Sequence, residues 1–181
     1  MNAMKKMLLL LLFLPCLAWA AKAHEHGVVK LNITVEQSQV NISMVSSLDG
    51  VVGFERAPKT PAEIAKVDDA VSKLSAADKV FKIDAAASCR IVKTTLTAPV
   101  IGVGVAAPVA DPSGHGDLEG EFVFECQDAS KVSQIEVALF DAFPGMRRID
   151  VQAATSAGQN KRTLRRGPRS GGQVVLLSRQ K

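Results

Sequence analysis

The fold is decided by the stretch VVKLNITVEQSQVNISMVS, which occupies residues 28–46. Apolar and polar side chains alternate along its first half and again along its second half, on either side of a polar Gln37-Ser38 pair. The apolar members of this alternation are Val29, Leu31, Ile33, Val35, Val40, Ile42 and Met44. A period of two is typical of a strand with one buried face, and two such runs joined by a short polar turn predict a β-hairpin over residues 28–46.

The segment after the hairpin carries a strong signal for the start of a helix. Thr60-Pro61-Ala62-Glu63 combines an N-cap, a proline at the first helical position and a capping-box glutamate, and it predicts one main helix over about residues 61–80. Further alternation predicts strands at about 89–97, 118–126, 134–140 and 147–155, with a last edge strand at 173–177. The order of these elements predicts an α+β fold, an antiparallel β-sheet or sandwich with one main helix.

Residues 102–117 are rich in glycine and proline and predict a surface loop. The loop begins with Gly102-Val-Gly104, which is similar to a dinucleotide-binding turn, but such a turn needs a helix behind it to hold a pyrophosphate. Pro108 and Pro112 prevent that helix. The chain contains no nucleophile-elbow or phosphate-loop motif, and we expect no enzymatic activity.

Residues 1–23 have the pattern of a secretory signal peptide. Lys5 and Lys6 precede an apolar run over residues 7–14, and small residues follow near Ala20 and Ala23. We expect cleavage after Ala20 or after Ala23 and export of the mature chain. Because the apolar run is shorter than the roughly 20 residues that span a bilayer, we expect no transmembrane segment in the mature chain.

Charge is distributed unevenly along the mature chain. Residues 24–160 hold 12 basic and 18 acidic side chains, whereas residues 161–181 hold seven basic side chains and no acidic one. A nucleic-acid-binding domain would spread basic and aromatic residues over its folded body, so we expect no nucleic-acid partner. We divide the chain into the signal peptide, one α+β domain over 24–164, and a basic C-terminal tail over 165–181 that contains the edge strand.

Two cysteines, Cys89 and Cys126, remain after the signal peptide is removed. A pair of cysteines in an exported protein predicts one disulfide bond. Closing a loop of about 38 residues would stabilise the fold by about 3–4 kcal/mol. The alternative is a pair of metal-binding thiols, which the absence of a C-x-x-C spacing disfavours.

The three histidines lie at two places, His24 and His26 at the mature N-terminus and His115 in the glycine-rich loop. Imidazole combined with carboxylate suits Zn²⁺ or Cu²⁺, and Asp117 and Glu119 follow His115 closely. The histidines can share one ion only if the first strand and the strand at residue 118 are neighbours, or nearly so, and begin at the same edge of the sheet.

Two other interpretations of the histidines stay open. Cleavage after Ala23 would make His26 the third residue behind a free amine, an arrangement that chelates copper or nickel. Alternatively, His24 and His26 are a frayed polar start of the chain, and His115 is a solvated loop residue.

Four motifs occur in the order found in one known family. They are AHEHGV (23–28), LDGVVGFERAP (48–58), HGDLE (115–119) and LFDAFP (139–144). In these motifs the chain resembles the DUF2796 family, whose best-described members are periplasmic zinc-binding proteins of the zinc-regulated ZrgA type. The resemblance covers residues 23–164 and implies export to the periplasm, the fold and the disulfide.

The chain departs from that family in two places, and both departures remove metal ligands. Family members commonly carry a His/Asp/Glu-rich insertion where residues 106–114 of this chain contain no histidine, and often a histidine where this chain has Arg56. The predicted site is therefore small: His24, His26 and His115, supported by Asp117 or Glu119.

The resemblance leads to a functional prediction with two alternatives. We expect an exported periplasmic metal-binding protein, with zinc as its metal, that supports metal uptake and hands zinc to a component of a metal-uptake transporter. One alternative is a periplasmic interaction module that has lost metal binding. The other is a copper enzyme that uses an N-terminal histidine.

Overall fold

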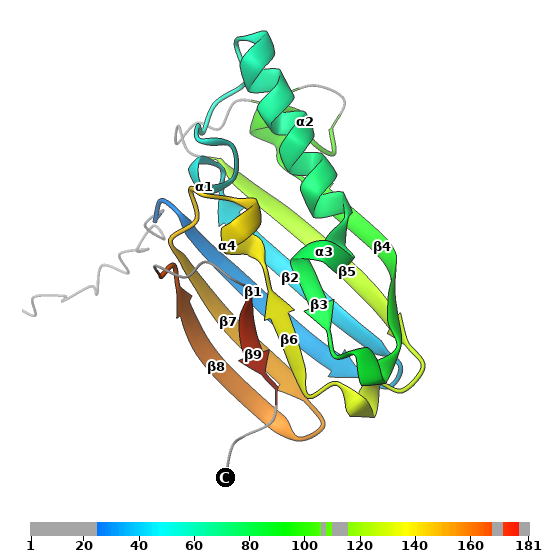
Figure 1. Ribbon diagram of the computed structural model, residues 1–181. Helices are drawn as coiled ribbons and strands as arrows, with labels where there is room; N and C mark the ends of the chain where they lie inside the picture. Colours follow the sequence, from blue (N-terminus) through cyan, green and yellow to red (C-terminus); the bar gives the residue numbers. More distant parts are fainter. Residues whose placement is uncertain (1–24, 106–107, 110–115, 168–171, 178–181) are drawn as a thin grey trace, which may run out of the picture.

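The computed structural model describes residues 25–105, 108–109, 116–167 and 172–177. A six-stranded sheet with the order β4-β5-β2-β1-β7-β8 forms one layer, and a three-stranded sheet with the order β3-β6-β9 lies in front of it (Figure 1). The strands are β1 (Val28–Glu36), β2 (Gln39–Ser47), β3 (Phe81–Ile83), β4 (Cys89–Thr97), β5 (Asp117–Cys126), β6 (Gln134–Val137), β7 (Arg148–Thr155), β8 (Gly158–Arg165) and β9 (Gln173–Leu176). The helices are α1 (Leu48–Val52), α2 (Pro61–Ser75), α3 (Ala77–Val80) and α4 (Leu139–Ala142), with short 3-10 turns at Ala85–Ala87, Pro99–Ile101 and Ala129–Lys131. This architecture confirms the predicted α+β sandwich class.

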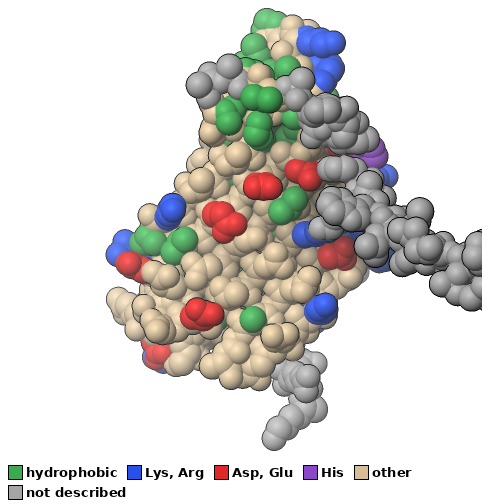
Figure 2. All heavy atoms as spheres, turned by 180° about the vertical axis from the view of Figure 1, so that it is seen from behind, with side chains coloured by type: hydrophobic (Ala, Val, Ile, Leu, Met, Phe, Trp, Pro, Cys, Tyr) green, Lys and Arg blue, Asp and Glu red, His purple; other side chains and the backbone are tan. Residues whose placement is uncertain are grey.

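The hairpin of β1 and β2 forms the centre of the large sheet, as the alternating pattern predicts. The strands pair antiparallel from Val29 opposite Ser46 to Glu36 opposite Gln39, and the chain reverses through Gln37 with a positive φ of 51°. The apolar positions face the second layer and are at most 1% exposed; they are Val29, Leu31, Ile33, Val40, Ile42 and Met44. The opposite face of this sheet is exposed, with mostly neutral surface and scattered charged side chains (Figure 2).

One parallel pair in the large sheet decides which residues meet. β1 pairs parallel with β7, and β2 pairs antiparallel with both β1 and β5. Strands β1, β5 and β7 therefore all begin at one end of the sheet, where Val28 lies opposite Arg148 and Ser47 lies opposite Asp117. Only β2 separates β1 from β5, which is the near-neighbour arrangement that a shared histidine site requires.

The predicted main helix is divided in two. Both hydrogen bonds of the capping box at the start of α2 are present, from Glu63 N to Thr60 Oγ1 (3.2 Å) and from Thr60 N to Glu63 Oε2 (3.3 Å). The helix ends at Ser75, and the non-helical backbone of Ala76 separates it from α3. The break allows Phe81 to enter the core, where its ring packs 5.0 Å from that of Phe122.

Other elements differ from the sequence expectations in length or existence. The segment predicted as a strand over 134–140 forms β6 and then turns into α4. Strand β8 was not predicted, because Leu164 is its one buried residue and its remaining side chains are polar, charged or glycine. In the described ranges, no helix is both long and apolar enough to cross a membrane.

A disulfide joins Cys89 to Cys126 and confirms the predicted pairing. The two cysteines lie directly opposite each other where β4 begins and β5 ends. This is the end of the sheet opposite to the one at which β1, β5 and β7 begin.

Candidate metal centre

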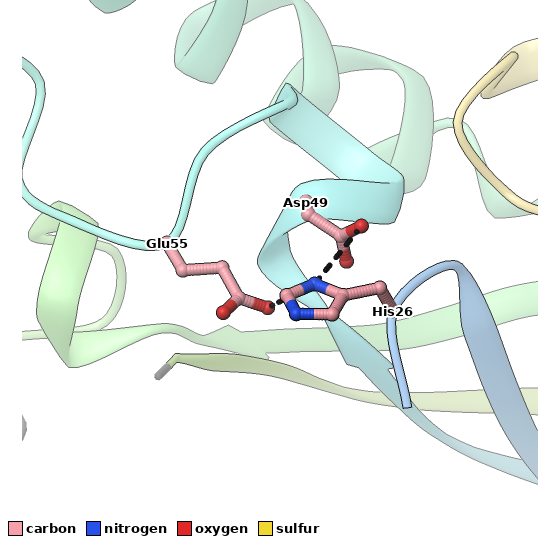
Figure 3. Close-up of side chains that lie close together, drawn as sticks. All are labelled: His26, Asp49 and Glu55. Carbon is pink, nitrogen blue, oxygen red and sulfur yellow. Dashed lines mark ion pairs between the residues drawn. The ribbon is translucent and has the colours of Figure 1, made fainter. Parts of the chain in front are cut away.

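Three side chains that could hold a metal ion converge at the end of the sheet where β1 begins: His26, Asp49 and Glu55 (Figure 3). His26 Nδ1 lies 3.3 Å from Asp49 Oδ2 and 3.5 Å from Glu55 Oε1. One ligand atom from each of the three residues lies within 4.8 Å of the others. The cluster therefore offers one imidazole and two carboxylates to a single point.

Each ligand comes from a separate piece of backbone. His26 precedes β1, whereas Asp49 lies in the first turn of α1, directly after β2. Gly53 ends α1 in the left-handed conformation (φ 86°), and its N–H donates to Asp49 O at 3.0 Å. This turn reverses the chain so that Glu55 comes back toward Asp49, as Figure 3 shows.

The carboxylate of Asp49 is held in place by the backbone beside His26. The N–H of Gly27 donates to Asp49 Oδ1 (3.2 Å) and to Ser47 Oγ (3.1 Å), which leaves Asp49 Oδ2 facing the imidazole. Partial burial alone would raise the pKa of Asp49, but hydrogen bonds from Ser47 and Gly27 outweigh it and lower the pKa. Asp49 is consequently ionised at neutral pH, the state that a metal ligand needs.

The two separations from His26 Nδ1 are of the size found between ligands of a tetrahedral zinc site. Ligands about 2 Å from zinc in a tetrahedron lie about 3.3 Å from one another, close to the two measured separations from His26 Nδ1. The side chain of Glu55 is 11% exposed and that of His26 is 51% exposed, so the cluster is covered on one side and open on the other. Three protein ligands with an open side leave a fourth position for water or an incoming donor.

The loop that carries Glu55 is fastened to the start of α2. Arg56 donates to both carboxylate oxygens of Glu63, at 2.6 and 3.1 Å, and its guanidinium lies over the ring of Phe54 at 5.3 Å. The backbone N–H of Lys59 also donates to Glu63, at 2.6 Å. Together these bonds lower the pKa of Glu63 to about 2, with the Arg56 hydrogen bond as the largest cause. Arg56 therefore anchors the loop of the ligand Glu55.

The sequence-predicted site residues overlap with this cluster at His26. His24 and His115 lie outside the described residues. Asp117 begins β5 opposite Ser47, and Glu119 is exposed two residues further along, opposite Val45. Neither acid belongs to the cluster around His26 that the structure describes.

Asp49 and Glu55 were missed by sequence reasoning. Both lie in LDGVVGFERAP, which supplied one of the motifs that resemble a known family. The motif is therefore a sequence signal for these ligands, but proximity in the sequence favours acids that closely follow a histidine, as Asp117 and Glu119 follow His115. Here the acids lie 23 and 29 positions after His26, and the fold brings them together.

A family model described as "ZrgA family zinc uptake protein" matches residues 23–170, which include all three residues of the cluster and both cysteines. A search of curated proteins finds no match.

Proposed function

The chain belongs to the ZrgA family of zinc uptake proteins, and on this premise we propose that it is an exported, non-enzymatic protein that binds zinc at His26, Asp49 and Glu55 and passes it to an uptake system. The observation that carries the proposal is the convergence of these three side chains, whose ligand atoms lie within 4.8 Å of one another. Two carboxylates balance the charge of Zn²⁺, and one imidazole supplies the nitrogen ligand that zinc favours.

The open side of the cluster supports a role in transfer. Structural zinc sites are commonly closed by four protein ligands, whereas a site with three protein ligands keeps a position that an incoming donor can occupy. The exposure of His26 gives such a donor access from solvent. A component of a metal-uptake transporter that presents its own zinc ligands is the partner that this chemistry fits.

The proposed compartment is the periplasm. Residues 1–23 have the pattern of a signal peptide, and the chain contains a disulfide of the kind that persists in oxidising compartments. Membership in a zinc uptake family agrees with a location outside the inner membrane.

His24 and His115 remain proposed ligands for the fourth position. His24 directly precedes Glu25 in the chain, and His115 directly precedes Gly116, whose carbonyl accepts a hydrogen bond from the N–H of Leu48 at 2.9 Å. The described neighbours of these histidines in the sequence, Glu25 and Gly116, thus lie at the end of the sheet that carries the cluster. If the N-terminal amine, His24 and His26 formed the site instead, copper or nickel would be the preferred metal.

Calorimetric titration of the mature, metal-free protein with Zn²⁺ tests the proposal, and we expect one site per chain. His26 belongs to every proposed ligand set, so the variants that discriminate are Asp49→Asn and Glu55→Gln, each of which should weaken zinc binding at least about tenfold. Glu121→Gln, on the exposed face of β5, is the matched control and should bind as the wild type does.

Three results would overturn parts of the proposal. Wild-type affinity in Asp49→Asn and Glu55→Gln, with loss in His115→Ala, would move the site to the histidine set. Preference for copper over zinc, retained in both acid variants, would assign binding to the terminal chelate. The absence of binding by any of these metals would favour an interaction module.

A further inference from the structure

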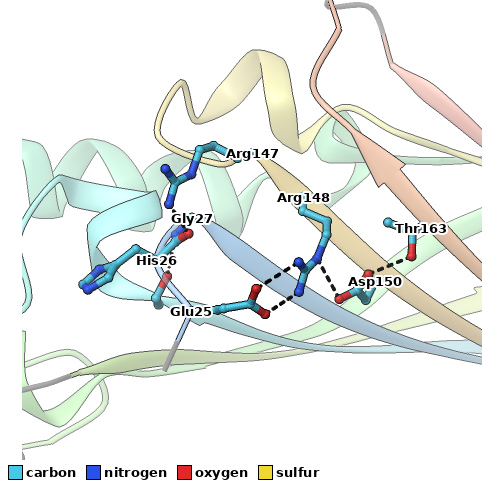
Figure 4. A network of polar contacts seen from close by, with 8 residues as sticks. Glu25, His26, Gly27, Arg147, Arg148, Asp150 and Thr163 are labelled. Carbon is cyan, nitrogen blue, oxygen red and sulfur yellow. Dashed lines mark hydrogen bonds and ion pairs between the residues drawn. The ribbon is translucent and has the colours of Figure 1, made fainter. Parts of the chain in front are cut away.

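The three residues that lead into β1, Glu25, His26 and Gly27, are held in place by the start of β7. The first residues of a domain are usually poorly ordered unless other parts of the fold tie them down. In Figure 4, the side chains of Glu25 and His26 extend in different directions from this segment. Two arginines contact it: Arg148, the first residue of β7, and Arg147, the residue before it. His26 is the only nitrogen ligand of the described cluster, so the order of this segment bears directly on the zinc site.

The first contact is an ion pair between Glu25 and Arg148. The guanidinium donates to both carboxylate oxygens, from Nη1 to Oε1 at 3.0 Å and from Nη2 to Oε2. Paired hydrogen bonds of this kind fix orientation as well as distance. The Arg148 hydrogen bond also lowers the pKa of Glu25, so the pair is charged at neutral pH.

Arg148 is itself oriented from its other side. Its Nε donates to Asp150 Oδ2 at 3.1 Å, and Asp150 Oδ1 accepts a hydrogen bond from Thr163 Oγ1 at 2.8 Å. The chain of contacts therefore runs from β8 through β7 to the residue before His26 (Figure 4). Because both of its partners are carboxylates, a neutral side chain at position 148 could not replace it.

The backbone on either side of the His26 side chain is fixed as well. Arg147 Nη2 donates to His26 O at 2.5 Å, and Gly27 O accepts the N–H groups of Arg147 (2.8 Å) and Arg148 (3.2 Å). Gly27 N donates in turn to Ser47 and Asp49. These bonds hold the segment so that the imidazole faces the two acidic ligands.

We propose that Arg148, acting through its ion pair with Glu25, is a positioning residue for the zinc ligand His26. The inference rests on the proposed function, because it assigns a role toward the same site. With the pair intact, the entropy lost in ordering the terminal segment is part of folding and does not weaken zinc binding. Without it, the segment frays and zinc must order it.

The sign of the change in zinc affinity separates a positioning role of Arg148 from an effect of its charge alone. Arg148→Met removes a positive charge near the cluster, which by Coulomb attraction alone would strengthen the binding of Zn²⁺. A positioning role predicts the opposite sign. We expect Arg148→Met to weaken zinc binding about tenfold, the size found when groups that orient a metal ligand are lost.

Calorimetric titration of the full mature protein with Zn²⁺ is the experiment, together with the visible spectrum of the Co²⁺-loaded protein, which reports ligand geometry at the ion. Glu25→Gln should also weaken binding, and the double variant should be no weaker than Arg148→Met alone, because the Glu25 contact is already lost when Arg148 is replaced. Arg148→Lys should recover part of the affinity. Arg90→Met, which breaks the exposed pair between Arg90 on β4 and Glu125 on β5, is the matched control and should change neither readout.

The possible failures are distinguishable. If Arg148→Met binds zinc as tightly as the wild type or more tightly, while Asp49→Asn and Glu55→Gln lose binding, the positioning role is wrong and the zinc site stands. If His26→Ala binds zinc like the wild type, the site itself is wrong. Should Arg148→Met fail to fold, Glu25→Gln removes the same pair from the exposed partner, and the Co²⁺ spectrum carries the test, because the loss of a charge alone would weaken binding without changing ligand geometry. A wild-type Co²⁺ spectrum in Glu25→Gln would then overturn the positioning role.

Discussion

The two ends of the six-stranded sheet are held together by different kinds of contact. At the end where β5 finishes, a covalent bond joins Cys89 to Cys126, and Cys126 N donates to Ser38 O in the β1–β2 turn at 2.8 Å. At the end where β1 begins, hydrogen bonds around Gly27 and the Glu25–Arg148 ion pair join the neighbouring segments without a covalent bond. The covalent end can be permanently closed, whereas under the proposed function the end that carries His26, Asp49 and Glu55 has to admit and release an ion. We infer that the disulfide that stabilises the fold and the site that exchanges a metal ion lie at opposite ends of one sheet, so that each can change without the other.

The largest expected effect is the loss of the covalent contact. The double variant Cys89→Ala/Cys126→Ala should lower the free energy of unfolding by about 3–4 kcal/mol and the Tm by about 10 °C, because the unfolded chain gains the entropy of an open loop. Zinc affinity should stay at the wild-type value. Denaturant unfolding and calorimetric titration measure the two quantities, and the wild type under reducing conditions is the control.

A fall in zinc affinity in that variant would show that the two ends are coupled and would contradict the comparison. Rapid alkylation of both cysteines in the native, unreduced protein would contradict the disulfide itself.

The next effect in size is the stabilisation that zinc provides. At a free zinc concentration about 100 times Kd, binding to the folded state alone should raise the free energy of unfolding by about 2.7 kcal/mol. Asp49→Asn, with its zinc affinity weakened at least about tenfold, should lose about half of this increment or more, and the cysteine-free variant should keep all of it if the ends are independent. Thermal melts of the three proteins with and without zinc provide the measurement, and a smaller increment in the cysteine-free protein would argue against independence.

The sequence predicted one end of the sheet better than the other, for a physical reason. The cysteine pairing follows from export and an even number of thiols, and the hairpin follows from a strict period of two, both of which are local or compositional signals. The meeting of His26 with Asp49 and Glu55 depends instead on the left-handed turn at Gly53 and on how the chain around Gly27 is bonded. A one-dimensional pattern does not contain such contacts.

Strand β8 illustrates the same limit within the fold. An edge strand with one buried residue, Leu164, has no alternation of apolar and polar side chains to detect. Its place is set by its antiparallel partner β7, which in turn pairs with β1. The parallel pairing of β1 and β7 brings Arg148 to Glu25, and no periodicity in either segment predicts it.

The third effect compares two glycines at the two ends. Gly27 has a φ of 68°, and an added Cβ would lie 2.8 Å from both Arg147 Nε and Gly145 O. Gly158, the first residue of β8 at the disulfide end, has a φ of 125° and no atom within 4 Å of such a Cβ. Gly27→Ala should therefore lower the free energy of unfolding by about 1–3 kcal/mol and also weaken zinc binding, since it displaces the segment that carries His26.

Gly158→Ala is the matched control, because it introduces backbone strain without a collision and far from the site. It should destabilise the protein less than Gly27→Ala and leave zinc affinity unchanged. Equal zinc affinity in the two variants would mean that the backbone at Gly27 does not position the ligand.

The smallest effect is the acid sensitivity of the loop that carries Glu55. Glu63 has a pKa of about 2 in the folded protein, below its ordinary value of 4.5, because Arg56 and the N–H groups of Lys59 and Thr60 bond to its carboxylate. A pKa that folding lowers contributes stability that is fully present above the unfolded value and is lost as the pH falls through the folded value. The stability contributed by Glu63 should therefore decline as the pH drops from about 4.5 toward 2.

Denaturant unfolding of the wild type and of Glu63→Gln across this range measures the decline. The difference between the two proteins should be constant above pH 5, where both the folded and the unfolded carboxyl are ionised, and should shrink below it. Thr60→Ala removes the other half of the capping box without removing an ionisable group, so it should cost about 1 kcal/mol at every pH in the range. If the Glu63→Gln difference were equally independent of pH, the Arg56–Glu63 pair would not form in solution.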